Sequence, residues 1–364
     1  MNPIEKRIRR LDAFQQRHLV PGFVFGIIKK YGDDNAGNLA GALAHSAFGS
    51  VFPLLLFLVT ILGIILGSHS ALRNDVVHST LRQFPIVGSH LGSSISALHR
   101  NSVLGLGVGI GGTIWGSIGL AENGIFTMMQ VWNLPGPQRP NYPKRMARAI
   151  GFLVLLGVGL LATTFLTGVV PRITSGVWLT VGSTVLSALL NSGEYLVGFR
   201  ILTPGDVRVR QLLPGAVVAG CAWTVIEEFG GLIVGHYLMN DTAVYGLFAI
   251  VLGLFAWIYI GVQVTVYAAE INVVLARKLW PRAIVNPPMT RADRRSMAAQ
   301  ANQNRRRPEQ RVRVTFTEGP LTEDEFFAAG GADDQPGGSA DDHGQSATTG
   351  NGQPTGTERA PATD

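Results

Sequence analysis

Residues 149–170 read AIGFLVLLGVGLLATTFLTGVV, a run of 22 residues without a charged side chain. A helix of about 20 apolar residues is long enough to cross the hydrocarbon core of a bilayer. Five further apolar runs of similar length contain neither Lys nor Arg: residues 47–67, 102–120, 177–199, 214–238 and 243–269. Backbone polar groups in lipid must be satisfied within their own segment, so we expect an all-α fold with six transmembrane helices.

The composition supports a membrane protein with a polar tail. Only 15% of the residues are charged, whereas a soluble globular chain carries about 25%. The net charge of +6 is unevenly distributed, because residues 286–364 hold 9 Arg, no Lys and 12 acidic residues, a net charge of −3, and the remaining chain carries +9. The basic balance therefore belongs to an apolar body, and we expect no nucleic-acid partner.

The Lys and Arg residues alternate between the two sides that six spans define. Eighteen lie before the first run, between the second and third, between the fourth and fifth, or directly after the sixth. The opposite side has only four, namely Arg73, Arg82, Arg100 and Arg172. Because cytoplasmic loops are enriched in Lys and Arg, this distribution predicts a multi-pass plasma-membrane protein with both termini in the cytoplasm.

Three regions follow from these patterns. Residues 1–38 form a basic N-terminal and interfacial segment, residues 39–285 the six-helix domain, and residues 286–364 a cytoplasmic tail predicted to be disordered, since its composition cannot bury a core. The tail is basic from Arg291 to Arg313 and acidic from Glu318 onward. The basic part is either a binding segment for anionic lipid or a solvated flank. In the first outer loop, apolar residues at helical spacing predict two amphipathic helices.

Acidic residues within the apolar runs are the candidate functional residues. Glu227 and Glu228 lie near the middle of the fifth run, and Glu194 lies with Asn191 in the cytoplasmic third of the fourth. An ionisable group inside a membrane is costly and is by default a functional hypothesis. Neighbouring residues on a helix are about 100° apart, so that Glu227 and Glu228 can border one wide cavity without pointing the same way. Because no run contains Lys or Arg, these acids are either protonated or line water. The alternative to a functional role is a set of hydrogen bonds that only holds the helices together.

The short motifs that could indicate a catalytic, cofactor or metal site lack the surrounding structure or spacing that such a site requires. Gly107, Gly109 and Gly112 match a dinucleotide fingerprint as a string, but they lie inside an apolar run and not between a strand and a helix. Glycines at this spacing instead allow close helix packing. The outer-loop histidines lack the i, i+4 spacing of metal ligands. We therefore expect no catalytic residue, no cofactor and no metal.

The order of several short motifs resembles the YihY/virulence factor BrkB family of bacterial inner-membrane proteins. The motifs are GALAHSAFGSVFPL at residues 41–54, LPGA at 213–216, and YG, WIY and AEIN along residues 245–272. The matching positions are Pro53, Pro214, Gly215, Tyr245, Gly246, Trp257, Tyr259, Glu270 and Asn272. The resemblance implies six helices, cytoplasmic termini, and a role in the cell envelope such as lipid or solute transport. It also implies that the old ribonuclease BN label of some members is a misassignment.

Together these observations predict a non-enzymatic protein of the bacterial inner membrane. We expect it to bind or transport a lipid or small amphiphile through an acidic intramembrane cavity. Two alternatives stay open: a scaffold that recruits partners through its tail, and a membrane-embedded enzyme. The expected partners are membrane lipids, and a second copy of the chain is also compatible with the sequence.

Overall fold

The computed structural model describes residues 3–66, 102–173, 177–285 and 288–316, and these residues contain helices and no β-strand. The predicted amphipathic helices of the first outer loop fall within residues 67–101, outside the described residues. In chain order the elements are α1 (Pro3–Arg17), α2 (Leu19–Asp33), α3 (Ala36–Leu66), α6 (Ser102–Val131), the 3-10 helix η1 (Gly136–Gln138), α7 (Tyr142–Ile173), α8 (Val177–Leu202), α9 (Val209–Arg277) and α10 (Arg291–Gln303).

The predicted apolar runs all lie on helices. The first run falls on α3, the second on α6, the third on α7 and the fourth on α8, and α9 carries both the fifth and the sixth. Within the described residues, three helical stretches are long and apolar enough to cross a membrane: Tyr142–Thr163, Val209–Phe229 and Val251–Arg277. They coincide with the third, fifth and sixth predicted spans. The all-α class is therefore confirmed for the described residues, whereas six spans and cytoplasmic termini stay predictions.

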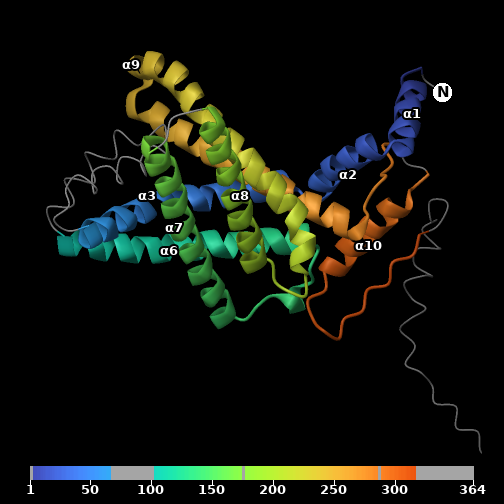
Figure 1. The fold of residues 1–364 in the computed structure, drawn as a ribbon. Helices are drawn as coiled ribbons and strands as arrows, with labels where there is room; N and C mark the ends of the chain where they lie inside the picture. The colour runs from blue at the N-terminus through green and yellow to red at the C-terminus, as the bar shows by residue number, and fades with distance from the viewer. Residues whose placement is uncertain (1–2, 67–101, 174–176, 286–287, 317–364) are drawn as a thin grey trace, which may run out of the picture. The chain divides into compact units, whose positions relative to one another are not determined.

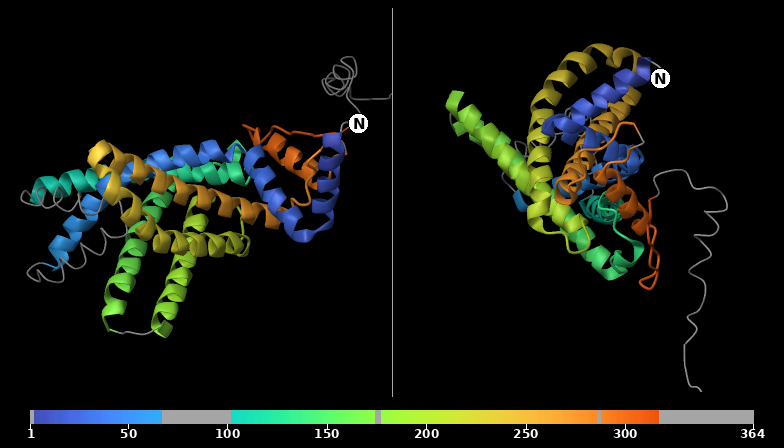
Figure 2. Two further views of the ribbon diagram at one scale, coloured as in Figure 1. Left: turned by 90° about the horizontal axis from the view of Figure 1, so that it is seen from above. Right: turned by 90° about the vertical axis from the view of Figure 1, so that its right-hand side faces the viewer.

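Helix α9 curves back on itself, so that its two halves lie side by side as antiparallel arms (Figures 1 and 2). The Gly215 N–H donates to Oδ1 of Asn272 at 2.7 Å, and the rings of Trp223 and Trp257 lie 6.4 Å apart between centroids. The predicted loop between the fifth and sixth spans is absent, because the helical backbone runs on through residues 239–242. That segment reads MNDT and contains no Pro or Gly that would end a helix.

The helices α3 and α6 run side by side, and the pair formed by α7 and α8 crosses them steeply (Figures 1 and 2). A glycine sets the distance between α3 and α6. A Cβ atom built on Gly116 would lie 2.9 Å from the Ser50 Cα atom, which is closer than real Cβ atoms come to backbone. Gly220 of α9 plays the same part against Ser192 of α8. Small residues at such crossings let helix backbones approach closely.

The ordered part of the chain extends beyond the predicted boundary at residue 286. Helix α10 begins with a capping box in which Thr290 and Asp293 satisfy each other's backbone N–H groups. One face of α10 is buried, including Ala292, Asp293 and Ser296, and the compact unit reaches from Met1 to Val314. The prediction of disorder from residue 286 is therefore wrong for α10, because Asp293 of this helix forms buried ion pairs with Lys29 and Arg282. Residues 317–364 lie outside the described residues.

Candidate functional site

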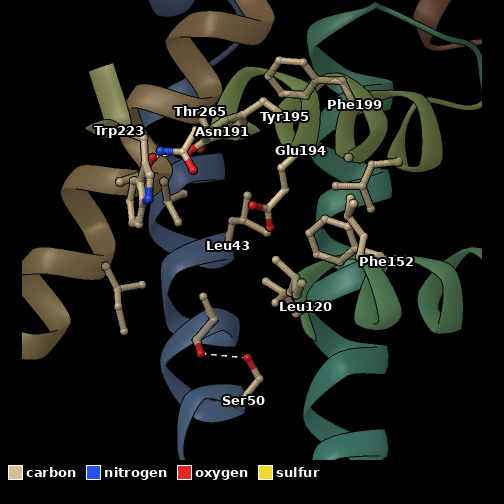
Figure 3. A pocket seen from close by; sticks show the side chains of 18 of the residues that line it. Leu43, Ser50, Leu120, Phe152, Asn191, Glu194, Tyr195, Phe199, Trp223 and Thr265 are labelled. Carbon is tan, nitrogen blue, oxygen red and sulfur yellow. Dashed lines mark hydrogen bonds between the residues drawn. The ribbon is translucent and has the colours of Figure 1, made fainter. Parts of the chain in front are cut away.

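A cavity of about 320 Å³ lies between α3, α6, α7, α8 and both arms of α9 (Figure 3). Most of its wall is aliphatic or aromatic, and the polar groups are few. The polar residues that line it are Ser50, Thr163, Asn191, Glu194, Tyr195, Glu227 and Thr265. An apolar pocket with a few converging polar groups is the usual form of a small-molecule site.

Helix α8 lines the cavity with one of its faces. Asn191, Glu194, Tyr195 and Gly198 follow one another at three- and four-residue spacing, which places them on one face of a helix. Figure 3 shows the Glu194 side chain extending into the cavity between Leu43 and Phe152 of neighbouring helices. Asn191 and Glu194, both candidate residues from the sequence, thus lie on one face of α8 and line the cavity.

The Glu194 carboxylate rests directly against the backbone of α7. A Cβ atom at Gly159 would overlap both carboxylate oxygens of Glu194, so that any other residue there would displace the end of the Glu194 side chain. Among the described residues, no hydrogen-bond donor contacts this carboxylate. Glu194 is therefore an acidic group that enters an apolar cavity without a partner.

The second carboxylate, Glu227, is held by hydrogen bonds. Trp223 Nε1 donates to its Oε1 at 2.8 Å, and Asn191 Nδ2 donates to its Oε2 at 3.3 Å. Asn191 is only 2% exposed and also donates to Thr224 Oγ1 at 3.0 Å. Because Asn191 belongs to α8 and Glu227 to α9, this network connects the two helices and fixes the direction of the Glu227 carboxylate.

Glu228 does not belong to this cavity. Its side chain is exposed and is absent from the cavity wall. The rotation of about 100° between neighbouring helical residues turns Glu227 inward and Glu228 outward. The expectation that both residues border one cavity is therefore wrong for Glu228, whereas Asn191, Glu194 and Glu227 do come together.

The positions that match the family motifs fall into three groups. Trp257 lines the cavity, and Tyr259 packs against the hydrophobic core. Gly215, which follows Pro214, and Asn272 form the close contact between the arms of α9, and Glu270 is completely buried. Pro53, Tyr245 and Gly246 lie outside the part of the chain whose side-chain surroundings the structure describes.

The sequence reading missed a second polar cluster, in which α2, the end of α9 and α10 meet. Lys30 is 0% exposed, forms an ion pair with Asp34, and lies 3.4 Å from Oε2 of Glu270. Arg282 is equally buried and pairs with Asp33 at 2.6 Å and with Asp293 at 2.7 Å. The i, i+4 spacing of Lys30 and Asp34 is a signal for this ion pair in the sequence, whereas a count of Lys and Arg indicates topology only.

Asp293 is the anchor of this cluster. Its burial raises the pKa of the carboxyl, but hydrogen bonds from the Ala283 N–H, Arg282, Lys29 and Thr290 outweigh burial and hold the pKa well below its usual range. The Arg282 and Lys29 contacts measure 2.7 and 2.9 Å. Each charged side chain of the cluster has a neighbour of opposite charge, although Glu270 Oε1 and Arg282 Nη1 are buried without a hydrogen-bond partner among the described residues. The ion pairs between α2, the end of α9 and α10 make the cluster a structural clamp.

The described residues contain no group of three His, Cys, Asp or Glu side chains that could hold a metal ion. The charged groups of the otherwise mostly apolar cavity wall are the carboxylates of Glu194 and Glu227.

Comparison with known proteins matches residues 27–291 to the family described as Virulence factor BrkB. The chain belongs to the virulence factor BrkB family. The matched region contains all five helices that form the cavity and ends at the first residue of α10. The resemblance predicted from the motifs is thus confirmed.

Curated relatives of this BrkB family chain are UPF0761 membrane proteins. One from Alteromonas mediterranea is 25% identical over 258 residues, which cover 68% of the chain and 85% of the relative. One from Pseudoalteromonas translucida is 26% identical over 263 residues, with 69% and 85% coverage. One from Aliivibrio fischeri is 25% identical over 245 residues, with 64% and 76% coverage. No solved structure matches the chain. The family and its relatives make this chain a membrane protein.

Proposed function

We propose that this BrkB family protein binds a lipid or small amphiphile in the cavity and moves it through the membrane. The observation that carries the proposal is the cavity itself, which combines apolar walls with the carboxylates of Glu194 and Glu227. Ionisable groups within membrane helices are costly and mark substrate or ion pathways more often than chance. A purely structural carboxylate would accept hydrogen bonds as Glu227 does, whereas Glu194 has no such donor among the residues that the structure describes.

The size of the cavity limits what it can hold. A volume of about 320 Å³ is at the lower end of the range for ligand pockets. It accommodates a head group with a short part of an acyl chain, and not a complete lipid. The proposed ligand would therefore place its polar end near Glu194 and leave most of its chain outside the cavity.

The proposed setting is the bacterial inner membrane, with six spans and both termini in the cytoplasm. The support is the distribution of Lys and Arg, which favours one side by eighteen to four. In this orientation the basic segment from Arg291 to Arg313 would lie near the anionic inner leaflet and could add lipid contacts. We propose no enzymatic role and no nucleic-acid partner.

A flux assay tests the proposal. Purified protein in proteoliposomes would be compared with the double variant Glu194→Gln/Glu227→Gln, using a fluorescent lipid whose exchange between leaflets is followed by quenching. The matched control is Glu228→Gln, which makes the same chemical change one residue away but outside the cavity. Transport by the wild type and by the control, together with loss in the double variant, would support the proposal. Equal flux in all three, or none in the wild type, would refute it.

The scaffold alternative predicts a different result. A scaffold that acts through its tail would lose function when residues 317–364 are deleted, whereas a transporter would keep its flux. The deletion must begin after α10, because this helix is packed against α2 and belongs to the compact unit.

A further inference from the structure

The charges that line the cavity are all of one sign. Glu194 and Glu227 contribute carboxylates, and no Lys, Arg or His is found among the lining residues that the structure describes. Burying a charge without a counter-charge is expensive. Where the structure supplies no cation, a ligand can supply it.

Aromatic rings surround the same space. Trp223 and Trp257 come from the two arms of α9, with ring centroids 6.4 Å apart and planes tilted by 57°. Tyr195 and Phe199 come from α8, with centroids 5.9 Å apart. All of these residues line the cavity, and Figure 3 shows the Phe152 ring beside the end of the Glu194 side chain. The faces of aromatic rings attract cations, and rings combined with a carboxylate are typical of ammonium recognition.

The two carboxylates have different parts to play. Both oxygens of Glu227 already accept hydrogen bonds, from Trp223 and Asn191, so that Glu227 contributes a fixed negative potential. Glu194 has no donor among the described residues and extends into the cavity. Gly159 keeps the space against α7 open for the Glu194 carboxylate. Glu194 is therefore the group that is free to meet a ligand.

We infer that the cavity binds the head group of a cationic or amine-bearing amphiphile, an alkylammonium, with Glu194 as its counter-ion and the aromatic side chains around it. This inference rests on the proposed function and names the substrate class of the same site. An anionic head group would meet two carboxylates and no compensating cation. A neutral hydroxylated head group would gain hydrogen bonds but no ion pair with Glu194.

Three amphiphiles with the same twelve-carbon chain test the inference. The full-length protein in maltoside micelles would be titrated with dodecyltrimethylammonium, dodecylsulfonate and glycerol monododecyl ether, and binding measured by calorimetry. We expect the ammonium to bind at least about tenfold more tightly than the other two. A further arm with a short-chain phosphatidylethanolamine distinguishes an amino-lipid from a soluble cation, since both present an ammonium group.

Variants assign the binding to the cavity. Glu194→Gln should weaken the ammonium about tenfold or more and leave the sulfonate no weaker. Glu194→Asp keeps the charge and should keep the preference for the ammonium even if it binds less tightly. Glu228→Gln, outside the cavity, should change neither. Size-exclusion profiles identical to that of the wild type establish that each variant is folded.

The outcomes separate this inference from the proposed function. Preferred binding of the sulfonate or the glycerol ether, abolished in Glu194→Gln, would overturn the cation inference and leave an amphiphile site in place. Ammonium binding that is equal in wild type and Glu194→Gln would also overturn it. If none of the amphiphiles binds, both the inference and the proposed function fail.

Discussion

Replacing Asp293 with Asn removes the negative charge at the centre of the buried clamp that attaches α10. The carboxylate accepts hydrogen bonds from Arg282 Nε at 2.7 Å, Lys29 Nζ at 2.9 Å, the Ala283 N–H at 3.0 Å and the Thr290 hydroxyl at 2.8 Å. Removing one partner of a buried ion pair costs about 3–5 kcal/mol. Arg282 retains Asp33 at 2.6 Å, which places the expected cost at the lower end, about 3 kcal/mol.

The expected consequence is a local opening of α10, not global unfolding. A loss of about 3 kcal/mol in opening free energy corresponds to roughly 150-fold faster amide exchange. Hydrogen exchange with mass spectrometry on peptides from residues 288–303 measures this directly. The matched control is Glu309→Gln, the same acid-to-amide change at an exposed position after α10. Exchange of α10 in Asp293→Asn that equals that of Glu309→Gln would show that the buried contacts do not hold this helix.

Three further predictions follow from the described contacts. The pKa of Asp293 is depressed, so that its contribution to stability is complete above the ordinary aspartate pKa of about 4 and is lost as the pH falls through the lower pKa of the folded state. Amide exchange of α10, corrected for the intrinsic rate, should therefore be constant between about pH 5 and 8. Faster corrected exchange within that window would contradict this role of Asp293. Gly116→Ala should lower the melting temperature, at a cost of about 1–3 kcal/mol, because Ser50 backbone lies 2.9 Å from the new Cβ, whereas Gly119→Ala, with nothing within 4 Å, should be neutral or slightly stabilising. Deleting residues 317–364 should leave the melting temperature unchanged. Deleting residues 288–364 should lower it, because Lys29 and Arg282 lose their ion-pair partner Asp293. Equal melting temperatures for the two deletions would argue against the clamp.

The helices were predictable because their signal is local. Long apolar runs without Lys or Arg predict helix in a membrane whatever they pack against, and the described parts of all six runs are helical. The absence of a break in α9 was harder to foresee, since the polar residues 240–242 (Asn-Asp-Thr) resemble a loop in composition. Their sequence lacks Pro and Gly, which was the relevant local fact.

The candidate site was only partly predictable, because it depends on which helices are neighbours. The cost of an acid within a membrane helix singled out Glu194 and Glu227, but nothing in the sequence showed that α8 packs against this part of α9. The aromatic part of the cavity wall, formed by Trp223 and Tyr195, also depends on the packing of α8 against α9. Glu228 was included wrongly, since the phase of a helix relative to a cavity is set by tertiary packing.

The buried clamp could not be predicted from the sequence for a different reason. Lys30 and Arg282 were counted as cytoplasmic charges, and a count of charges contains no information on burial. The capping sequence Thr290-Arg-Ala-Asp293 is a local signal for the start of α10. A strongly polar segment can be ordered when its charges find partners elsewhere in the chain.

The central claim is that the cavity beside Glu194 and Glu227 is occupied by an amphiphile in the membrane. The most direct measurement is photo-crosslinking of a diazirine-bearing alkylammonium to the full-length protein, followed by mass-spectrometric mapping of the labelled residues. The account predicts label on lining residues of α8 and α9 such as Tyr195 and Trp223, reduced in Glu194→Gln and unchanged in Glu228→Gln. Label confined to outward-facing residues such as Val154 and Leu189, with no effect of Glu194→Gln, would contradict it.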